Sequence, residues 1–308
     1  MIVAVASRKA SPGVTTLTTL LAAYWHEPGA SRLVVEADPS GGTLAARLST
    51  AHRLSWDPGL LSLSTTRGRI DAAALASVSQ QIDEGLWVAA APPSPDQVSA
   101  SLARMGDQGA SQLAAAPDIR AFVDCGRLTT SSPAASLARR AALTIIVCRP
   151  RLDEVHSLAP AVVELNEAGC TLGLVCVGDG PYPPTEVAST VGIELLGVIP
   201  VDHRAAAAFD NDGLEAGRVF RRSALAATLH ELAGLIGAKV AGTMAPNIDS
   251  RAPHSDLRWT PTGSAATDEP APTSGDELPV SLAVLAARTA QAQSAEGAER
   301  VAPGAGRE

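Results

Sequence analysis

Ser7-Arg8-Lys9-Ala10-Ser11-Pro12-Gly13-Val14-Thr15-Thr16 is the stretch of this 308-residue chain that decides its fold. Before it, Met1 to Ala6 form a short apolar run rich in β-branched residues, which predicts a buried strand. After it, residues 15–25 carry apolar side chains at helical spacing, at Leu17, Leu20, Leu21 and Tyr24. The sequence therefore predicts a strand, a tight loop and a helix in that order.

This predicted unit is a candidate phosphate site. A Gly/Pro/Ser loop that opens a helix on two threonines presents backbone N–H groups and a helix N-terminus to an anion. In the usual phosphate loop, G-x-x-x-x-G-K-[ST], a lysine reaches the β- and γ-phosphates and the next hydroxyl binds Mg²⁺. Here Gly13 and Thr15 keep their places, but Val14 occupies the lysine position. The pattern indicates a nucleotide switch with impaired chemistry.

Lysine is rare in this chain. Among 24 Lys and Arg residues, the only lysines are Lys9 and Lys239, and one of these lies inside the loop. A compact ammonium fits a crowded phosphate site where a planar guanidinium is harder to place. We therefore treat Lys9 as a candidate functional residue, with chance placement on a solvated loop as the alternative.

Residues 9–16 resemble the deviant Walker A motif, K-G-G-x-G-K-[ST]-T, of the ParA/MinD family of P-loop ATPases. Lys9 matches the family's signature lysine, which crosses a dimer interface to the partner's nucleotide. The resemblance implies nucleotide contacts from the rest of the loop, namely Ser11, Pro12, Gly13, Val14, Thr15 and Thr16. Ala10 and Ser11 replace two glycines of the motif, and Val14 replaces its Walker lysine, so hydrolysis is expected to be slow or absent.

Three further segments follow in the family's order, so the resemblance covers roughly residues 1–240. Residues 33–42 resemble the D-x-D-P-x-x-G segment, which places Asp38 where the family positions water or Mg²⁺. Residues 121–126 resemble the Walker B strand, and the resemblance implies that Asp124 holds Mg²⁺ through water. The resemblance likewise implies that the Thr15 hydroxyl binds Mg²⁺. Residues 195–202 resemble the late element beside the adenine, with Pro200 and Asp202. The Asn-Arg pair that often follows the preceding strand is absent.

Each of these segments also has a simple turn interpretation. Asp38-Pro39 followed by two glycines is good turn chemistry, and Asp124 before Gly126 could cap a turn. All of them nevertheless stand at the carboxyl ends of predicted strands, where doubly wound sheets bind their ligands. Their common order favours a site.

Apolar runs alternate with helical stretches along the rest of the chain. Continuous runs of this kind predict an α/β fold, a doubly wound and mostly parallel sheet with helices on both faces. The predicted strands are 33–35, 86–91, 121–123, 143–147, 172–177 and 195–199. With 46% hydrophobic residues, the chain can support one nucleotide-binding domain, which we place at residues 1–244.

Residues 245–308 differ in character and are rich in Pro, Ser, Thr and acidic residues. We predict a mostly disordered tail with one short Ala-rich helix near residues 278–294. Arg288 is the only basic residue of that helix, which argues against the basic membrane-docking helix of MinD-type proteins. No apolar run reaches the roughly 18 residues of a membrane span, and no signal-peptide pattern is seen, so an integral or secreted protein is not expected.

Net charge and cysteine content limit which binding partners and which cellular compartment we expect for this protein. The formal net charge of −8 argues against a globally basic nucleic-acid surface, and 3% aromatic residues offer no base-stacking platform. Nonspecific DNA could still be held through Arg218, Arg221 and Arg222, with a solvated helix face as the alternative. The four cysteines lie in or beside predicted strands without a C-x-x-C pair, which favours reduced thiols and a cytoplasmic protein.

The sequence therefore predicts a ParA/MinD-like switch that binds ATP with Mg²⁺, forms a homodimer and positions a cellular cargo. The resemblance leaves the cargo open between chromosome or plasmid partitioning, septum placement, and a pilus or secretion apparatus with its protein partners. The alternative is a pseudo-ATPase scaffold of the TadZ/CpaE type that acts without nucleotide, which Val14 favours. A metabolic P-loop amidotransferase or synthetase has little support, because no segment is left for a substrate domain.

Overall fold

The computed structural model describes residues 1–10, 12–212 and 218–244. Its centre is one eight-stranded sheet in the order β3-β4-β2-β5-β1-β6-β7-β8. The strands are β1 Ile2–Ser7, β2 Ser31–Glu36, β3 Gln80–Asp83, β4 Leu86–Ala89, β5 Ile119–Arg127, β6 Leu143–Cys148, β7 Leu172–Val177 and β8 Leu195–Ile199.

The first strand occupies the middle of this sheet. β1 pairs in parallel with β5 on one side and with β6 on the other, and its six residues are all buried. Every neighbouring pair is parallel except β3 and β4. The predicted mostly parallel sheet is confirmed, and so are all six of the strands predicted after residue 30. β3 was not predicted, because its residues alternate between half-buried and exposed positions and form no apolar run.

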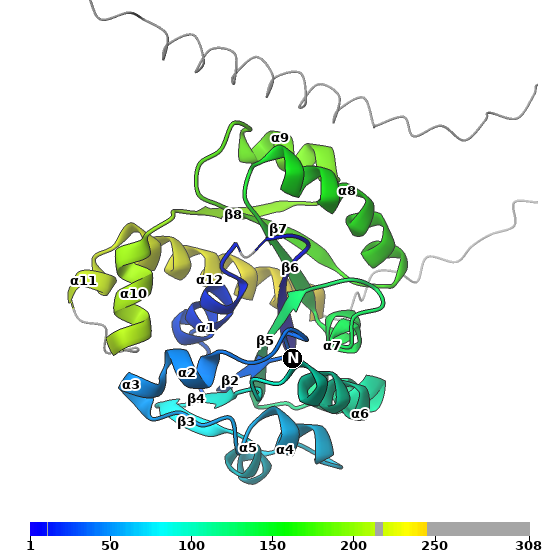
Figure 1. Cartoon of the computed structure of the whole chain (residues 1–308), viewed down its shortest axis with the longest axis vertical. Coiled ribbons are helices and arrows are strands. Elements are labelled where there is room, and N and C mark those ends of the chain that lie inside the picture. Colours follow the sequence, from blue (N-terminus) through cyan, green and yellow to red (C-terminus); the bar gives the residue numbers. More distant parts are fainter. Residues whose placement is uncertain (11, 213–217, 245–308) are drawn as a thin grey trace, which may run out of the picture.

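Helices cover both faces of the sheet (Figure 1). On one face lie α1 Val14–Tyr24, α2 Leu44–Arg47, α10 His203–Asp212, α11 Arg218–Arg221 and α12 Ala224–Met244. The other face is covered by α4 Leu60–Thr65, α5 Ala72–Val78, α6 Pro95–Ala114, α7 Ala135–Arg140, α8 Leu152–Glu167 and α9 Pro184–Val191. The remaining short helix, α3 Ser49–His52, contacts α10.

The core consists of two apolar layers, one on each side of the sheet. Alternate residues of β1 enter opposite layers, with Val3 and Val5 facing α1 and α12, and Ile2 and Ala4 facing α6 and α8. Most of the volume comes from Ala, Val and Leu, as the low aromatic content requires. The four cysteines, Cys125, Cys148, Cys170 and Cys176, are buried in the layers and are free thiols.

The last described helix, α12, runs from Ala224 to Met244. Its window Ala224–Gly242 is long and apolar enough to cross a membrane, contrary to the prediction that no apolar run reaches that length. In this fold Leu229, Leu232 and Ile236 are buried against α1 and β8. The predicted tail, 245–308, with its helix near 278–294, lies outside the described residues.

Candidate functional site

The loop between β1 and α1 has the backbone shape of an anion-binding loop. Gly13 is the residue before α1 and has a positive φ of 99°, and its carbonyl accepts a hydrogen bond from Leu17 N at 2.8 Å. Ala10, at a position where the motif has glycine, also has a positive φ, of 60°. A residue other than glycine in this region costs about 1–2 kcal/mol, so the fold retains a conformation that its sequence does not favour. Ser11 lies outside the described residues.

Val14 is the first residue of α1 and turns inward. Its side chain is buried and packs in the layer that holds Leu17 and the residues of α12. The position that carries a cation in the usual loop is thus apolar and removed from solvent. To an anion, the described part of the loop offers backbone N–H groups, the hydroxyls of Thr15 and Thr16, and the charges of Arg8 and Lys9.

Asp124 is the most unusual group at this edge of the sheet. It lies on β5, beside β1, and its Oδ1 accepts a hydrogen bond from Gly126 N at 2.9 Å. Its Oδ2 is buried without a hydrogen-bond partner. Burial raises the pKa of Asp124 to about 7, the nearby Thr15 hydroxyl and the Gly126 amide oppose this shift, and Glu36 and Asp38 add to it by charge repulsion. An uncompensated carboxyl in such surroundings is costly unless a cation joins it.

Asp38 approaches the same place from the end of β2. Its Oδ1 accepts a hydrogen bond from Ser40 N at 2.8 Å. Its carboxyl group lies directly against Gly126, where a Cβ atom would be 2.1 Å from Asp38 Cγ. Gly126 has a positive φ of 57° as well. The predicted metal residues Thr15, Asp38 and Asp124 are therefore neighbours at one edge of the sheet.

Glu36 belongs to this group of carboxylates and was not predicted. Its side chain is buried and accepts hydrogen bonds from the backbone N–H groups of Thr43 at 2.6 Å, Leu44 at 2.9 Å and Ala91 at 2.9 Å. Burial raises the pKa of Glu36, and these bonds oppose that shift. Through these hydrogen bonds the Glu36 carboxylate connects β2 to the start of α2 and to the residues just after β4. The signal in the sequence was a carboxylate that closes an apolar strand, two residues before Asp38.

A second unpredicted contact links α2 to α1. Arg47 Nη2 donates a hydrogen bond to Thr16 Oγ1 at 2.9 Å, and both residues are half-buried. Thr16 is the third residue of α1, one turn from the loop. A guanidinium group therefore lies beside the helix N-terminus.

A cavity of about 380 Å³ opens beside the loop. Pro12, Gly13 and Thr16 line one side, and Pro200 and Asp202 line another, so the predicted loop and adenine-side residues share one space. Asp202 also caps α10, because its Oδ1 accepts a hydrogen bond from Ala205 N at 2.8 Å. Arg149 lines the cavity too, and its Nε donates to Glu154 Oε1 at 2.6 Å.

Lys9 forms an ion pair with α8, which carries none of the other predicted site residues. Its Nζ pairs with Asp153 Oδ2 of α8 at 3.3 Å, and about half of each side chain is exposed. Exposed pairs of this kind contribute about 0–1 kcal/mol. Lys9 is therefore free to exchange this partner at little cost.

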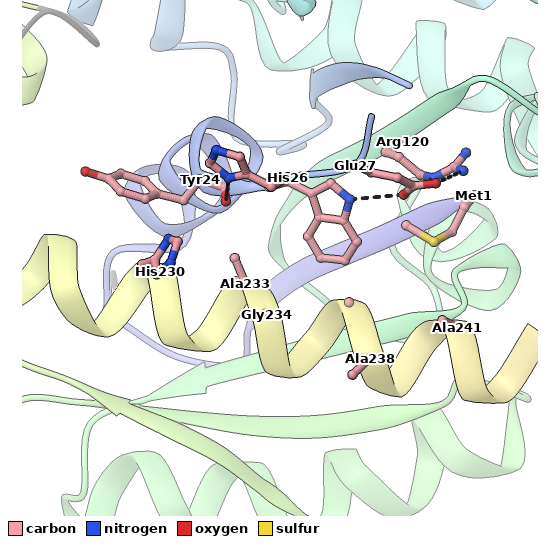
Figure 2. A pocket seen from close by; sticks show the side chains of 12 residues that line it. Met1, Tyr24, His26, Glu27, Arg120, His230, Ala233, Gly234, Ala238 and Ala241 are labelled. Carbon is pink, nitrogen blue, oxygen red and sulfur yellow. Dashed lines mark hydrogen bonds and ion pairs between the residues drawn. The ribbon is translucent and has the colours of Figure 1, made fainter. Parts of the chain in front are cut away.

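A larger cavity of about 480 Å³ lies at the opposite end of α1, between that helix and α12 (Figure 2). Its floor is made of small residues of α12, including Gly234 and Gly237. Its charged groups are already paired, since Arg120 Nε donates to Glu27 Oε2 at 2.7 Å and Trp25 Nε1 donates to the same oxygen at 3.3 Å. This cavity is larger than the one beside the loop, but none of the described residues that line it has a buried polar side-chain atom without a partner.

The Arg cluster considered for DNA lies away from the loop. Arg221 and Arg222 are exposed, whereas the side chain of Arg218 is outside the described structure. Arg221 lies near Tyr24 at the far end of α1, and its charge opposes the burial that raises the pKa of Tyr24.

The loop edge fits Mg²⁺ in one specific way. Within the described part of the chain, no three His, Cys, Asp or Glu side chains form a metal cluster. Mg²⁺, however, usually keeps several waters and takes one or two carboxylates together with phosphate oxygens. The unpartnered Oδ2 of Asp124 and the nearby Thr15 hydroxyl match that requirement.

Solved structures with the same fold were found, although no family profile and no curated protein matches the sequence. A ParA family ATPase from Chlorobium tepidum TLS is 18% identical, with a TM-score of 0.63 over 75% of this chain and 98% of that one. The cell division ATPase MinD of Pyrococcus furiosus is 21% identical, with a TM-score of 0.62 over 77% and 98%. MinD of Pyrococcus horikoshii OT3, complexed with Mg-ADP, is 21% identical, with a TM-score of 0.57 over 77% and 98%. The described part of this chain has the fold of the ParA/MinD ATPases.

Proposed function

We propose that this protein is a cytoplasmic nucleotide switch of the ParA/MinD type, which binds ATP with Mg²⁺ and dimerises around it. One observation carries the proposal: the buried Oδ2 of Asp124 has no partner and lies at the carboxyl end of β5, near the Thr15 hydroxyl. A loop with the right backbone shape and a cavity beside it complete the site. The similarity of fold to a MinD bound to Mg-ADP supports the same function.

In this proposal each element of the loop edge has one task. The backbone N–H groups of residues 13–16 hold the phosphates, while Pro200 and Asp202 border the base. Thr15 and Asp124 hold Mg²⁺, and Asp38 orients water beside them. The metal neutralises charge on the phosphate oxygens when it is bound, as it does in phosphoryl transfer generally.

Hydrolysis is expected to be slow or absent because Val14 supplies no charge. A charge-assisted hydrogen bond contributes about 1.5–3 kcal/mol, so its loss weakens nucleotide binding roughly ten- to a hundredfold without abolishing it. The transition state of phosphoryl transfer depends more strongly on positive charge than the bound ground state does. The protein would therefore change state mainly by binding and releasing nucleotide.

Lys9 is proposed to act between two copies of the chain. It leaves Asp153 at little cost, because both partners are exposed, and reaches the nucleotide of the second copy. Dimerisation and nucleotide binding would then support each other.

The proposed task of the dimer is to position a cellular cargo through protein partners. Among the solved structures with this fold, one is named a cell division ATPase and another a putative plasmid partition protein, which favours those two tasks. A pilus or secretion apparatus remains an alternative cargo. Nonspecific DNA, held through exposed Arg221 and Arg222 together with Arg218, is a further proposed partner.

A second candidate function is a scaffold of the TadZ/CpaE type that no longer binds nucleotide. The burial of Val14 favours it, because the loop has then lost its cation to the core. The two candidates differ in one measurable property, the affinity for Mg-ATP.

The deciding experiment is a calorimetric titration of the purified full chain with ATP and Mg²⁺, beside Lys9→Ala and Lys239→Ala. The switch is supported if the wild type binds ATP saturably and ATP raises its dimer fraction in light scattering. This rise in dimer fraction should be lost in Lys9→Ala and kept in Lys239→Ala. Lys239 is the matched control because it is the other lysine of the chain and pairs with Glu194, in the part of α12 that lies beside the C-terminal end of α1. No binding at millimolar ATP would leave the scaffold.

A further inference from the structure

The cavity at the C-terminal end of α1 is a mostly apolar groove on the surface of the described structure. One side is formed by α12 over residues 230–241, and the other by the end of α1 and the residues just after it, Tyr24, Trp25 and His26 (Figure 2). Gly234 and Ala241 of α12 line the groove and are exposed. The groove is therefore a surface onto which another segment can pack.

α12 leaves room for bulky side chains in this groove. A Cβ atom added at Gly234 would meet no atom within 4 Å, and one added at Gly237 would lie 3.4 Å from Cη2 of Trp25. The opposite side is held in place, because the Trp25 ring packs on Phe122 with centroids 5.2 Å apart and its Nε1 donates to Glu27 Oε2 at 3.3 Å. A preformed groove loses little conformational entropy when it is filled.

The sequence contains a segment with complementary side chains. Residues 278–289, which lie outside the described residues, read Leu-Pro-Val-Ser-Leu-Ala-Val-Leu-Ala-Ala-Arg-Thr and belong to the helix predicted near 278–294. Leu278, Leu282 and Leu285 recur at spacings of four and three, which predicts that they share one face of that helix. Large side chains on one helix pack well against small residues on the facing helix.

The length of this segment matches the groove, and the chain connects the two. At 1.5 Å per residue, a helix over 278–289 is about 18 Å long, close to the roughly 17 Å of α12 between residues 230 and 241. α12 ends at Met244, shortly after Ala241, and residues 245–277 join it to the segment. A stretch of that length reaches about 100 Å when extended, several times the length of the groove. Because both parts are on one chain, even a weak apolar contact is favoured by their effective concentration.

We propose that residues 278–289 form a helix that docks in the groove between α12 and the end of α1, with Leu278, Leu282 and Leu285 against the small residues of α12. This inference goes beyond the proposed function and requires no nucleotide. The groove is then filled by a segment of the same chain, which covers the exposed Gly234 and Ala241.

Limited trypsin digestion of the purified full chain tests this proposal, with cleavage measured by mass spectrometry. Arg288 lies inside the segment, whereas Arg300 lies beyond it and serves as the internal reference. Gly234→Met places a side chain in the groove, because Gly234 lines it and has open space at its Cβ position. We expect this variant to raise the ratio of cleavage after Arg288 to cleavage after Arg300 about tenfold, since proteolysis follows the population of the undocked state.

Gly242→Met is the matched control for this substitution. Gly242 is also an exposed glycine of α12 with open space at its Cβ position, but it does not line the groove. Its cleavage ratio should therefore stay within about twofold of the wild-type ratio. An equal rise in both glycine variants, or no rise in Gly234→Met, would overturn the proposal.

A second change tests the other side of the contact. Leu282→Asp combined with Leu285→Asp removes the apolar face of the segment, so it should raise the cleavage ratio as much as Gly234→Met does. Adding Gly234→Met to that pair should have no further effect, because both changes break the same contact. Additive effects would show that the segment does not use the groove. Protection of Arg288 that is lost when the wild-type chain is diluted would place the segment in the groove of a second copy, which contradicts docking within one chain.

Discussion

The two ends of helix α1 show how differently similar cavities can be built. At its C-terminal end the cavity of about 480 Å³ contains Glu27 and Arg120, which satisfy each other (Figure 2). At its N-terminal end lie a cavity of about 380 Å³, lined by Gly13 and Thr16, and the Thr15 hydroxyl near Asp124, whose buried Oδ2 has no hydrogen-bond partner. The smaller cavity is the nucleotide site in our proposal.

This difference indicates that a buried charged group without a partner marks a candidate binding site better than the volume of a cavity does. A folded protein satisfies almost all of its buried polar groups, so an exception needs a cause. At the C-terminal end of α1 every charged group discussed has a partner within the chain, and the space is explained by the small residues of α12. At the N-terminal end the proposed function supplies the missing partner of Asp124 Oδ2 as Mg²⁺. Four predictions test this contrast.

The largest effect is expected from Asp124→Asn. The folded pKa of about 7 is above the ordinary value of 3.8, so the folded state binds more protons between these values and its stability falls as pH rises through them. Above pH 7 the full penalty, on the order of 4 kcal/mol, is present in the metal-free wild type. Without metal the variant should therefore be more stable than wild type near pH 8, as measured by urea unfolding with a chelator present.

The control for this prediction is Asp107→Asn, an exposed carboxylate that pairs with Arg139 at 3.0 Å. Its effect should be small and should show no gain in stability at higher pH. Asp124→Asn should also lose Mg-dependent nucleotide binding. An unfolding difference between wild type and Asp124→Asn that stays constant from about pH 5 to about pH 8 would contradict the assignment of an uncompensated carboxyl.

Gly126→Ala is expected to have the second largest effect, about 3 kcal/mol, from strain at a positive φ together with displacement of Asp38. The new Cβ would lie 2.1–2.5 Å from the atoms of the Asp38 carboxyl group. Thermal unfolding and Mg-ATP titration measure the two consequences. Gly192→Ala isolates the first, since Gly192 has a φ of 74° and no atom within 4 Å of its added Cβ. Equal behaviour of the two variants would show that Asp38 does not depend on Gly126.

Glu36→Gln is expected to cost about 2 kcal/mol, because an amide nitrogen cannot accept the N–H bonds that both carboxylate oxygens now receive. The variant should also weaken ATP binding, since α2, which contacts α1 beside the loop, loses its anchor. Urea unfolding and calorimetry measure these effects. Glu164→Gln, an exposed residue of α8, is the matched control. A variant that loses stability but binds ATP normally would separate Glu36 from the site.

The smallest effect is expected from Glu27→Gln at the other end of α1. The carboxylate is partly exposed, and hydrogen bonding to Arg120 lowers the pKa of Glu27 more than burial raises it. Losing this pair should cost about 0–1 kcal/mol and leave ATP affinity unchanged. Differential scanning calorimetry and the same ATP titration provide the measurement. A marked loss of ATP binding would mean that the two ends of α1 are coupled, and the contrast drawn here would fail.

Local patterns in the sequence predicted the sheet and the loop well, for a physical reason. Strand, loop and helix around Gly13 are contiguous, so their hydrophobic periods and turn residues can be read directly. The strands that carry Asp38 and Asp124 are buried apolar runs, and parallel strands bring their carboxyl ends to one edge. These features required no knowledge of contacts between distant residues.

Contacts between distant residues were the part that could not be predicted. Arg47 and Thr16 are 31 positions apart, and no period or spacing rule links a residue of a one-turn helix to α1. The pairing of Lys9 with Asp153 is of the same kind. Glu36 was not predicted as a site residue, because the sequence does not distinguish a buried carboxylate at the end of an apolar strand from a carboxylate exposed to solvent. Its role depends on three N–H groups that only the folded chain brings together.

The scarcity of lysine gives this protein a useful chemical property. Lys9 and Lys239 are its only lysine side chains, and they make exposed or partly exposed ion pairs at separate places, with Asp153 and with Glu194. An amine-acylating reagent would therefore label two side chains, one in the phosphate loop and one on α12. Their relative labelling in a mass spectrum is an internally referenced reporter: occupation of the loop or approach of a second copy protects Lys9 while Lys239 reacts as before.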